Sequence, residues 1–212
     1  MIRCDDIFVD SDFSQFEKIC QIIRRYDFNH LIGITPLGEG KKLWTRKRSL
    51  WKIPLYKFLV NYRIKRMTGE KFVGDNVELM KILDTEFKKY EAIPALHGLY
   101  HYRYDRRSQN NVYEELSIGI ELLKKLFDLR VMVFTPPFNA WNRGTELVCK
   151  RLNLSIDKCI TGFDTLIMNM NSCQIKELAR QQSSVPEVFY HPHCILNLEK
   201  FELYLKTRRK YS

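Results

Sequence analysis

Residues 2–9, with the sequence IRCDDIFV, decide how this chain folds. The stretch has the mostly apolar composition of a short strand, and it carries two adjacent carboxylates, Asp5 and Asp6. A turn is expected at residues 11–14, and a helix over residues 15–26. The chain therefore opens with a strand followed by a helix.

The same alternation continues along the chain. Ser14 and Glu17 have the spacing of a capping box for the first helix. Apolar patterning predicts further strands at residues 30–35, 93–96, 130–135, 159–162, 166–170 and 188–191, and further helices at residues 76–90, 112–127, 145–152, 175–181 and 198–208. Alternating β and α elements with mostly apolar strands predict a parallel sheet or barrel.

Polar residues that can bind a metal or take part in catalysis gather near the ends of the predicted strands. They form four islands: Asp5-Asp6, His97, Thr135-Pro136 and His191. In parallel α/β folds, functional residues collect at the C-terminal ends of the strands. We therefore expect these islands to form one site at that edge of the sheet.

The first island can serve one site only if the strand bends. Adjacent residues on a strand point to opposite faces, so Asp5 and Asp6 would otherwise be separated. Burying them within an apolar strand would cost on the order of several kcal/mol unless a metal or a basic partner compensates. A pair that caps the next turn is the alternative, but the other islands favour a metal or catalytic role.

His97 and His101 stand four residues apart. On a helical turn both imidazoles would project to one side and could share a cation. This spacing alone is weak evidence, since such pairs are usually solvated or hydrogen-bonded. Four of the five histidines, however, fall in two tight pairs near predicted strand ends.

Length and charge define the organisation of the chain. The 212 residues, 45% of them hydrophobic, suffice for a core, and we expect a single domain over residues 1–212. The formal net charge of +10 comes from residues 41–66, which hold ten Lys and Arg and no Asp or Glu. This predicts a basic, aromatic insertion at about residues 40–68.

Three interpretations of this insertion remain open. It is a solvated segment that packs its aromatic residues on the barrel, a surface for anionic lipid, or a surface for an anionic saccharide carrier. A nucleic-acid partner is not expected, because no nucleic-acid-binding motif accompanies the charge at residues 41–66.

The cysteines and the N-terminal residues indicate the cellular compartment of the protein. Six cysteines are scattered without a CxxC pair, which favours reduced thiols used as small apolar residues. Residues 1–10 contain no apolar signal region, and no run is long enough to span a bilayer. We expect a cytoplasmic protein, with peripheral attachment to the inner face of the membrane as a variant.

Four segments resemble, in order, motifs of the polysaccharide deacetylase family, also called carbohydrate esterase family four. Residues 3–7 (RCDDI) resemble the TFDDG motif, and residues 97–101 (HGLYH) resemble HSxxH with the same histidine spacing. Residues 135–139 (TPPFN) resemble RxPYG, and residues 189–192 (FYHP) resemble the late LxxH motif. The resemblance covers nearly the whole chain.

The resemblance implies a distorted (β/α) barrel with fewer than eight strands and one divalent metal ion, most often zinc. The metal ligands that it implies are Asp6, His97 and His101. It further implies that Asp5 is the general base, that His191 is the general acid, and that the backbone N–H near Phe138 helps to hold the oxyanion. This set suits hydrolysis of an amide by metal-activated water.

The third motif departs from the family. Thr135 stands where the family has the arginine that orients the base. Arg3 lies two residues before Asp5 on the same strand face, so we expect it to supply the missing guanidinium. Phe138 and Asn139 replace the tyrosine and glycine of the motif and are expected beside the substrate.

Several residues have competing interpretations. His193 competes with His191 for the acid role, although Pro192 favours an ending strand and therefore His191. His30 opens an apolar strand and is interpreted as a structural histidine. Trp141 either stacks on a sugar face or packs on the barrel.

These residues lead to one expected function. It is metal-dependent removal of an N-acetyl group from an acetamido sugar or saccharide carrier, in polysaccharide or glycoconjugate biosynthesis. The alternatives are hydrolysis of another non-peptide C–N bond and a non-catalytic saccharide-binding barrel. The family's Asp-and-Trp motif has no convincing counterpart, and Asp157 and Asp164 are loose candidates that are not assigned.

Overall fold

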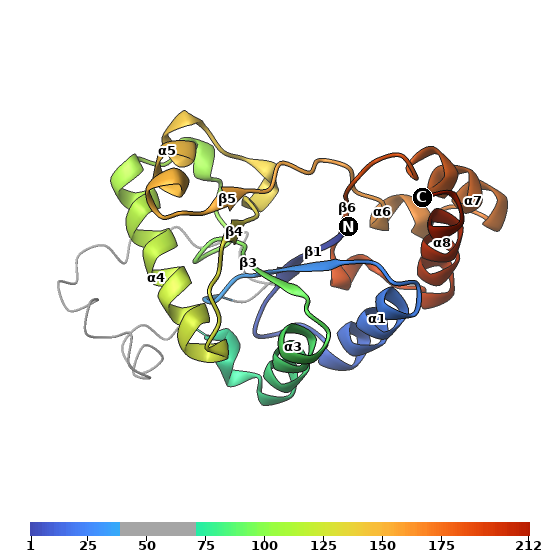
Figure 1. Ribbon diagram of the computed structural model, residues 1–212, viewed down its shortest axis with the longest axis horizontal. Coiled ribbons are helices and arrows are strands. Elements are labelled where there is room, and N and C mark those ends of the chain that lie inside the picture. The colour runs from blue at the N-terminus through green and yellow to red at the C-terminus, as the bar shows by residue number, and fades with distance from the viewer. Residues whose placement is uncertain (39–70) are drawn as a thin grey trace.

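The computed structural model describes residues 1–38 and 71–212 (Figure 1). The basic segment predicted at residues 40–68 lies outside these described residues, and so do the interpretations attached to it. Within the described part of the chain, no helix is long and apolar enough to cross a membrane.

In the described part of the chain, six parallel strands form one curled sheet, which confirms the predicted distorted barrel with fewer than eight strands. The strands are β1 (Ile2–Ile7), β2 (His30–Ile34), β3 (Ile93–Leu96), β4 (Val133–Phe134), β5 (Ser155–Ile156) and β6 (Val188–Tyr190). Their spatial order is β5-β4-β3-β2-β1-β6. An isolated bridge between Gly162 and Phe189 links the segment after β5 to β6, at the opposite edge of the sheet.

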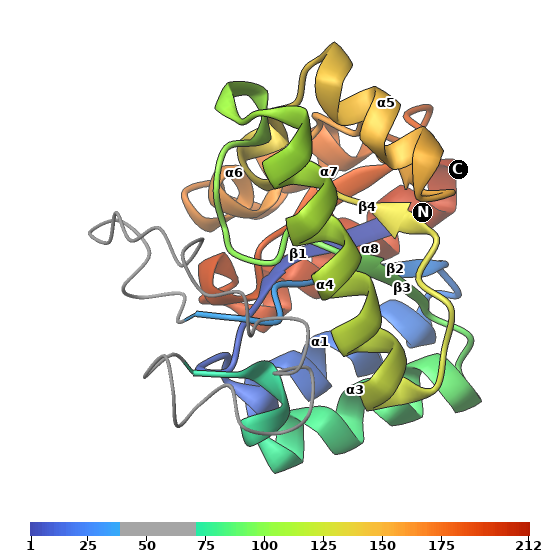
Figure 2. The same cartoon turned by 90° about the vertical axis from the view of Figure 1, so that its left-hand side faces the viewer.

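Helices cover the outside of the curled sheet (Figures 1 and 2). They are α1 (Phe13–Arg25), α3 (Val77–Lys89), α4 (Gln109–Phe127), α5 (Arg143–Arg151), α6 (Asp164–Met168), α7 (Ser172–Gln181) and α8 (Leu198–Tyr211). Helices α1 and α3 lie side by side below the sheet in Figure 1, and α7 packs on α8. Their apolar faces and the strands share one buried core.

Strand β1 bends at its two carboxylates. Cys4 pairs with Ile32 and Ile7 pairs with Ile34, so β1 holds one more residue than β2 between these pairs. Asp6 takes up this irregularity with a φ of 65°, in the left-handed region. The strand therefore has the bend that Asp5 and Asp6 require in order to serve one site.

Two predicted strands are wrong. Residues 159–162 form no strand beyond the bridge at Gly162; the fifth strand is instead Ser155–Ile156, which finds a partner in β4. Residues 166–170 overlap helix α6, because a short apolar run fits a buried helical turn as well as a strand.

The predicted cap of the first helix is also wrong. Helix α1 begins at Phe13, and Asp12 is its N-cap, accepting a hydrogen bond from the N–H of Gln15 at 3.0 Å. Ser14 therefore lies inside the first turn, two residues after the N-cap position. The remaining predicted elements are present, with bounds that differ by at most three residues.

Candidate active site

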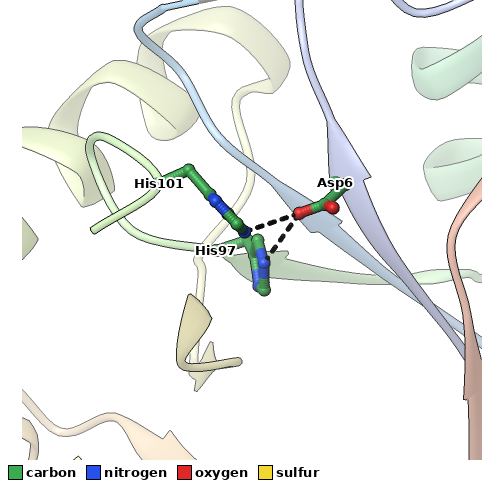
Figure 3. A group of neighbouring side chains, drawn as sticks. All are labelled: Asp6, His97 and His101. Atoms are coloured by element: carbon green, nitrogen blue, oxygen red, sulfur yellow. Dashed lines mark ion pairs between the residues drawn. The ribbon is translucent and has the colours of Figure 1, made fainter. Parts of the chain in front are cut away.

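Asp6, His97 and His101 converge at the C-terminal edge of the sheet (Figure 3). Asp6 comes from the bend of β1, His97 follows β3 directly, and His101 lies in the loop that continues from it. Asp6 Oδ1 is 3.1 Å from His97 Nε2 and 2.9 Å from His101 Nε2. The three residues that the sequence grouped are therefore brought together.

The two histidines are not on a helical turn, contrary to the sequence-based expectation. The segment is an irregular loop in which Gly98 has a φ of 78°, and a Cβ there would lie 2.5 Å from a backbone carbonyl oxygen. Buried Tyr104 supports the loop, accepting a hydrogen bond from the N–H of Leu99 at 3.2 Å. The loop, and not helical periodicity, brings His97 and His101 to one side.

Thr135 orients the first of these histidines. Its Oγ1 lies 2.9 Å from His97 Nδ1, and both side chains are buried. When Nδ1 carries the ring proton and donates to Thr135, the lone pair of Nε2 points toward Asp6. The sequence marked Thr135 only as a replacement for an arginine, and its contact with His97 was missed.

The donor set fits a divalent cation. One carboxylate and two imidazoles are ligand types that zinc accepts. Asp6 Oδ1 is buried and has no hydrogen bond of acceptable geometry from the described residues. Burial acts to raise the pKa of Asp6, but the imidazoles of His101 and His97 hold it well below its usual range. The site therefore presents an ionised carboxylate oxygen between two ring nitrogens.

Arg3 lies against Asp5, as the sequence suggested. Its Nε and Nη2 donate to Asp5 Oδ2 at 3.1 and 2.7 Å, and both side chains are almost fully buried. The other oxygen, Asp5 Oδ1, has no hydrogen-bond partner among the described residues and lies 3.7 Å from His97 Nδ1. One carboxylate oxygen is thus fixed, and the other faces the histidine cluster.

Arg3 has further partners inside the barrel. Nη2 also donates to Asn139 Oδ1 at 3.0 Å, Nη1 lies 3.2 Å from Asp157 Oδ1, and Cζ lies 4.8 Å from the Phe189 ring centroid. Burial opposes the charge, but Asp5 and Asp157 raise the pKa of Arg3. Asn139, expected beside the substrate, holds Arg3 with its side chain, and Asp157 acquires a partner that the sequence did not assign.

His191 is held on the other side of the cluster. Its Nδ1 lies 2.7 Å from Asp164 Oδ2, which also accepts from the His191 backbone N–H at 2.6 Å. Its Nε2 lies 3.9 Å from Asp6 Oδ2. Desolvation acts to lower the pKa of His191, but Asp164 and then Asp6 raise it overall. The sequence left Asp164 unassigned, and no local signal there marks it as a histidine partner.

Three more residues that the sequence singled out are Phe138, His193 and Trp141. Phe138, 46% exposed with a φ of 58°, places its ring centroid 4.4 Å from that of His101. His193 is exposed, with its ring 5.7 Å from that of His191, and partial desolvation lowers its pKa. Trp141 is half-buried, and Lys158 Nζ lies 5.9 Å from its ring.

Comparison with known proteins finds likeness in structure alone. No family model and no curated protein sequence matches the chain. A CE4 family pseudoenzyme from Bacillus anthracis is similar with a TM-score of 0.65 at 9% identity, over 99% of this chain and 60% of that one. A family 4 carbohydrate esterase from Streptomyces lividans gives 0.62 at 11% identity, over 97% and 85% of the two chains. The chitin deacetylase of Colletotrichum lindemuthianum gives 0.60 at 11% identity, over 98% and 80%.

These likenesses establish the fold, which is that of the CE4 polysaccharide deacetylases. The chain spans about 60% of the length of the Bacillus anthracis protein. That neighbour is a pseudoenzyme, so the fold does not by itself imply activity.

Proposed function

We propose that this chain, which has the fold of the CE4 deacetylases, is a metal-dependent hydrolase that removes the N-acetyl group from an acetamido sugar. One observation carries the proposal. The ligand set Asp6, His97 and His101 lies between a carboxylate held by Arg3 and an imidazole held by a carboxylate. This arrangement supplies cation ligands, a base and an acid at one strand edge.

Asp6, His97 and His101 would hold the divalent cation, which we take to be zinc. When bound, the cation supplies Lewis-acid polarisation of the amide carbonyl and lowers the pKa of water. Thr135 keeps the ring of His97 in the orientation that this requires.

Asp5 is the proposed base. Its Oδ1, which has no hydrogen-bond partner among the described residues, accepts a proton from the attacking water, while Arg3 holds Oδ2 in place. Addition of the water oxygen to the carbonyl carbon gives a tetrahedral oxyanion. We assign the backbone N–H of Phe138 as a donor to that oxyanion.

His191 is the proposed acid. Asp164 accepts from Nδ1, so the second proton of the imidazolium sits on Nε2, the nitrogen that faces Asp6. This proton passes to the nitrogen of the amide as the C–N bond breaks. Acetate and a free amine leave, and His191 is left neutral.

The substrate class follows from the chemistry together with the structural neighbours. One neighbour is named a chitin deacetylase and another a peptidoglycan N-acetylglucosamine deacetylase, and both names describe acetamido sugars. By transfer, we propose an acetamido sugar or a saccharide carrier as substrate for this chain, in polysaccharide or glycoconjugate biosynthesis. The exposed Phe138 ring beside His101 offers an apolar surface for a sugar face.

The test is acetate release from N-acetylglucosamine oligomers by the zinc-loaded protein. We expect turnover by the wild type and by Asp12→Asn, a change at the N-cap of helix α1, and its loss in Asp5→Asn. A wild type that binds zinc at Asp6, His97 and His101 yet releases no acetate from any acetamido sugar would refute the proposed activity. Circular dichroism of each variant separates lost chemistry from lost folding.

A further inference from the structure

A second group of metal-ligating side chains lies away from the candidate active site. Cys20 of α1, His30 at the start of β2 and Glu86 of α3 place one ligand atom each within 4.8 Å of one another. All three are buried, with exposed fractions of 0%, 6% and 3%. Because His30 opens its strand, this group is separate from the residues that follow the strand ends.

One ring nitrogen of His30 is buried and available to a ligand-binding role. Its Nε2 lies 3.1 Å from the Tyr190 hydroxyl, but Nδ1 has no hydrogen-bond partner among the described residues. Burial, with Arg24 as a lesser cause, lowers the pKa of His30 to about 3, so the ring is neutral at ordinary pH. In the tautomer that donates from Nε2 to Tyr190, Nδ1 carries a lone pair that is available to a cation.

The other two residues of the group, Glu86 and Cys20, can bind the same cation. Glu86 is buried and ion-paired with Arg24 through Oε1, so it supplies a carboxylate inside the core. Cys20 offers a sulfur, and burial raises the pKa of its thiol well above the usual range. A buried thiol of this kind stays protonated until a cation replaces its proton.

We propose that Cys20, His30 and Glu86 form a second zinc site that joins α1 and α3 to the sheet. Sulfur, imidazole nitrogen and carboxylate oxygen are all zinc ligands, and three protein ligands of a four-coordinate ion leave one position for water. Binding replaces the S–H bond of Cys20 with a zinc–sulfur bond and releases one proton to solvent. The two helices lie side by side (Figure 1), and the ligand atoms of the three residues lie within 4.8 Å of one another, so a single ion can reach all three.

Cobalt distinguishes this site from the candidate active site. Asp6, His97 and His101 offer only nitrogen and oxygen, whereas Cys20 would give a thiolate-to-cobalt charge-transfer band in the near ultraviolet. Titration of the metal-free protein with Co²⁺ should bring up this band, and metal analysis of the zinc-loaded protein should find two equivalents. Cys20→Ser should abolish the band and remove one equivalent.

Matched serine variants control for the other thiols. Cys149→Ser alters a buried cysteine on α5, and Cys194→Ser alters the cysteine near His191 and Asp164; both should keep the band and two equivalents. A wild type without the band overturns the proposal whatever the variants do. A band that survives Cys20→Ser but disappears in Cys194→Ser overturns it as well, because the thiolate would then lie at the active site.

Discussion

Arg3 donates two hydrogen bonds to a single oxygen of Asp5, at 3.1 and 2.7 Å, and leaves the second oxygen without a partner among the described residues. Both residues belong to β1 and are separated by one position, so the strand itself sets their geometry. The relationship supports a base with one fixed and one reactive oxygen. It also makes Arg3 the first residue to test.

Arg3→Ala should lower kcat for acetate release by about 10- to 100-fold, the usual loss when a supporting partner is removed. Bound zinc should stay near the wild-type amount, because the polar partners of Arg3 are Asp5, Asn139 and Asp157 and not the three proposed metal ligands. Arg3→Lys keeps the charge but not the paired geometry and should recover only part of the rate.

The matched control is Arg209→Ala, which removes an exposed ion pair with Asp27 and should leave kcat unchanged. Full activity in folded Arg3→Ala would show that Asp5 needs no guanidinium.

His191 and His193 can be separated by their kinetics. His191→Ala should lower kcat by about 10²- to 10⁴-fold, the usual contribution of a positioned acid. His193→Ala should cost less than about tenfold, because no carboxylate of the described residues holds exposed His193 as Asp164 holds His191. The reverse order of the two losses would transfer the acid role to His193.

Asp164→Asn should move the pH dependence of the rate. His191 donates only when protonated, so activity falls as pH rises through its pKa, and Asp164 raises that pKa. The variant should therefore lose activity at a lower pH than the wild type, with metal content unchanged. The measurement is kcat from pH 5 to 10, and an unmoved alkaline limb would mean that another group supplies the proton.

Thr135→Val should weaken metal binding. The variant removes the oxygen beside His97 Nδ1 while keeping the size of the side chain, and loss of such a partner costs about 10- to 100-fold in affinity. Zinc affinity is measured by competition with a chelator. Thr85→Val, on the exposed face of α3, serves as the control. An unchanged affinity would show that Thr135 does not orient the ring.

Glu115 should make stability depend on pH. Burial raises its pKa to about 7 from 4.5, although Arg107 opposes the shift. The folded state then holds a proton that the unfolded state has lost, so the free energy of unfolding falls as pH rises from about 4.5 to 7. The loss attributable to Glu115 has an upper limit on the order of 3 kcal/mol.

Urea unfolding at pH 5 and pH 8 measures this loss. Glu115→Gln should lose less stability between the two values than the wild type, because it cannot ionise. Glu114→Gln, its exposed neighbour on α4, should behave like the wild type. Equal losses in Glu115→Gln and wild type would place the pH dependence elsewhere.

Local patterning accounts for most of the predicted fold. Apolar runs and helical periodicity depend only on near neighbours in the chain, so they located most of the elements within three residues. The two failures, at residues 159–162 and 166–170, involve short apolar runs whose state depends on the partner that each finds. A strand of two residues such as β5 exists only because β4 lies beside it.

The sequence by itself determined which residues stand at the strand ends, since strand breaks and motif spacing are local properties. The tertiary structure alone decided the partners: Thr135 for His97, Asp164 for His191, and the register shift that turns Asp6 toward the histidines. Residues 27 or 38 positions apart meet only through the curvature of the sheet and the paths of its loops. Local sequence patterns do not specify how far apart such residues lie in space, because that distance is set by the packing of the whole fold.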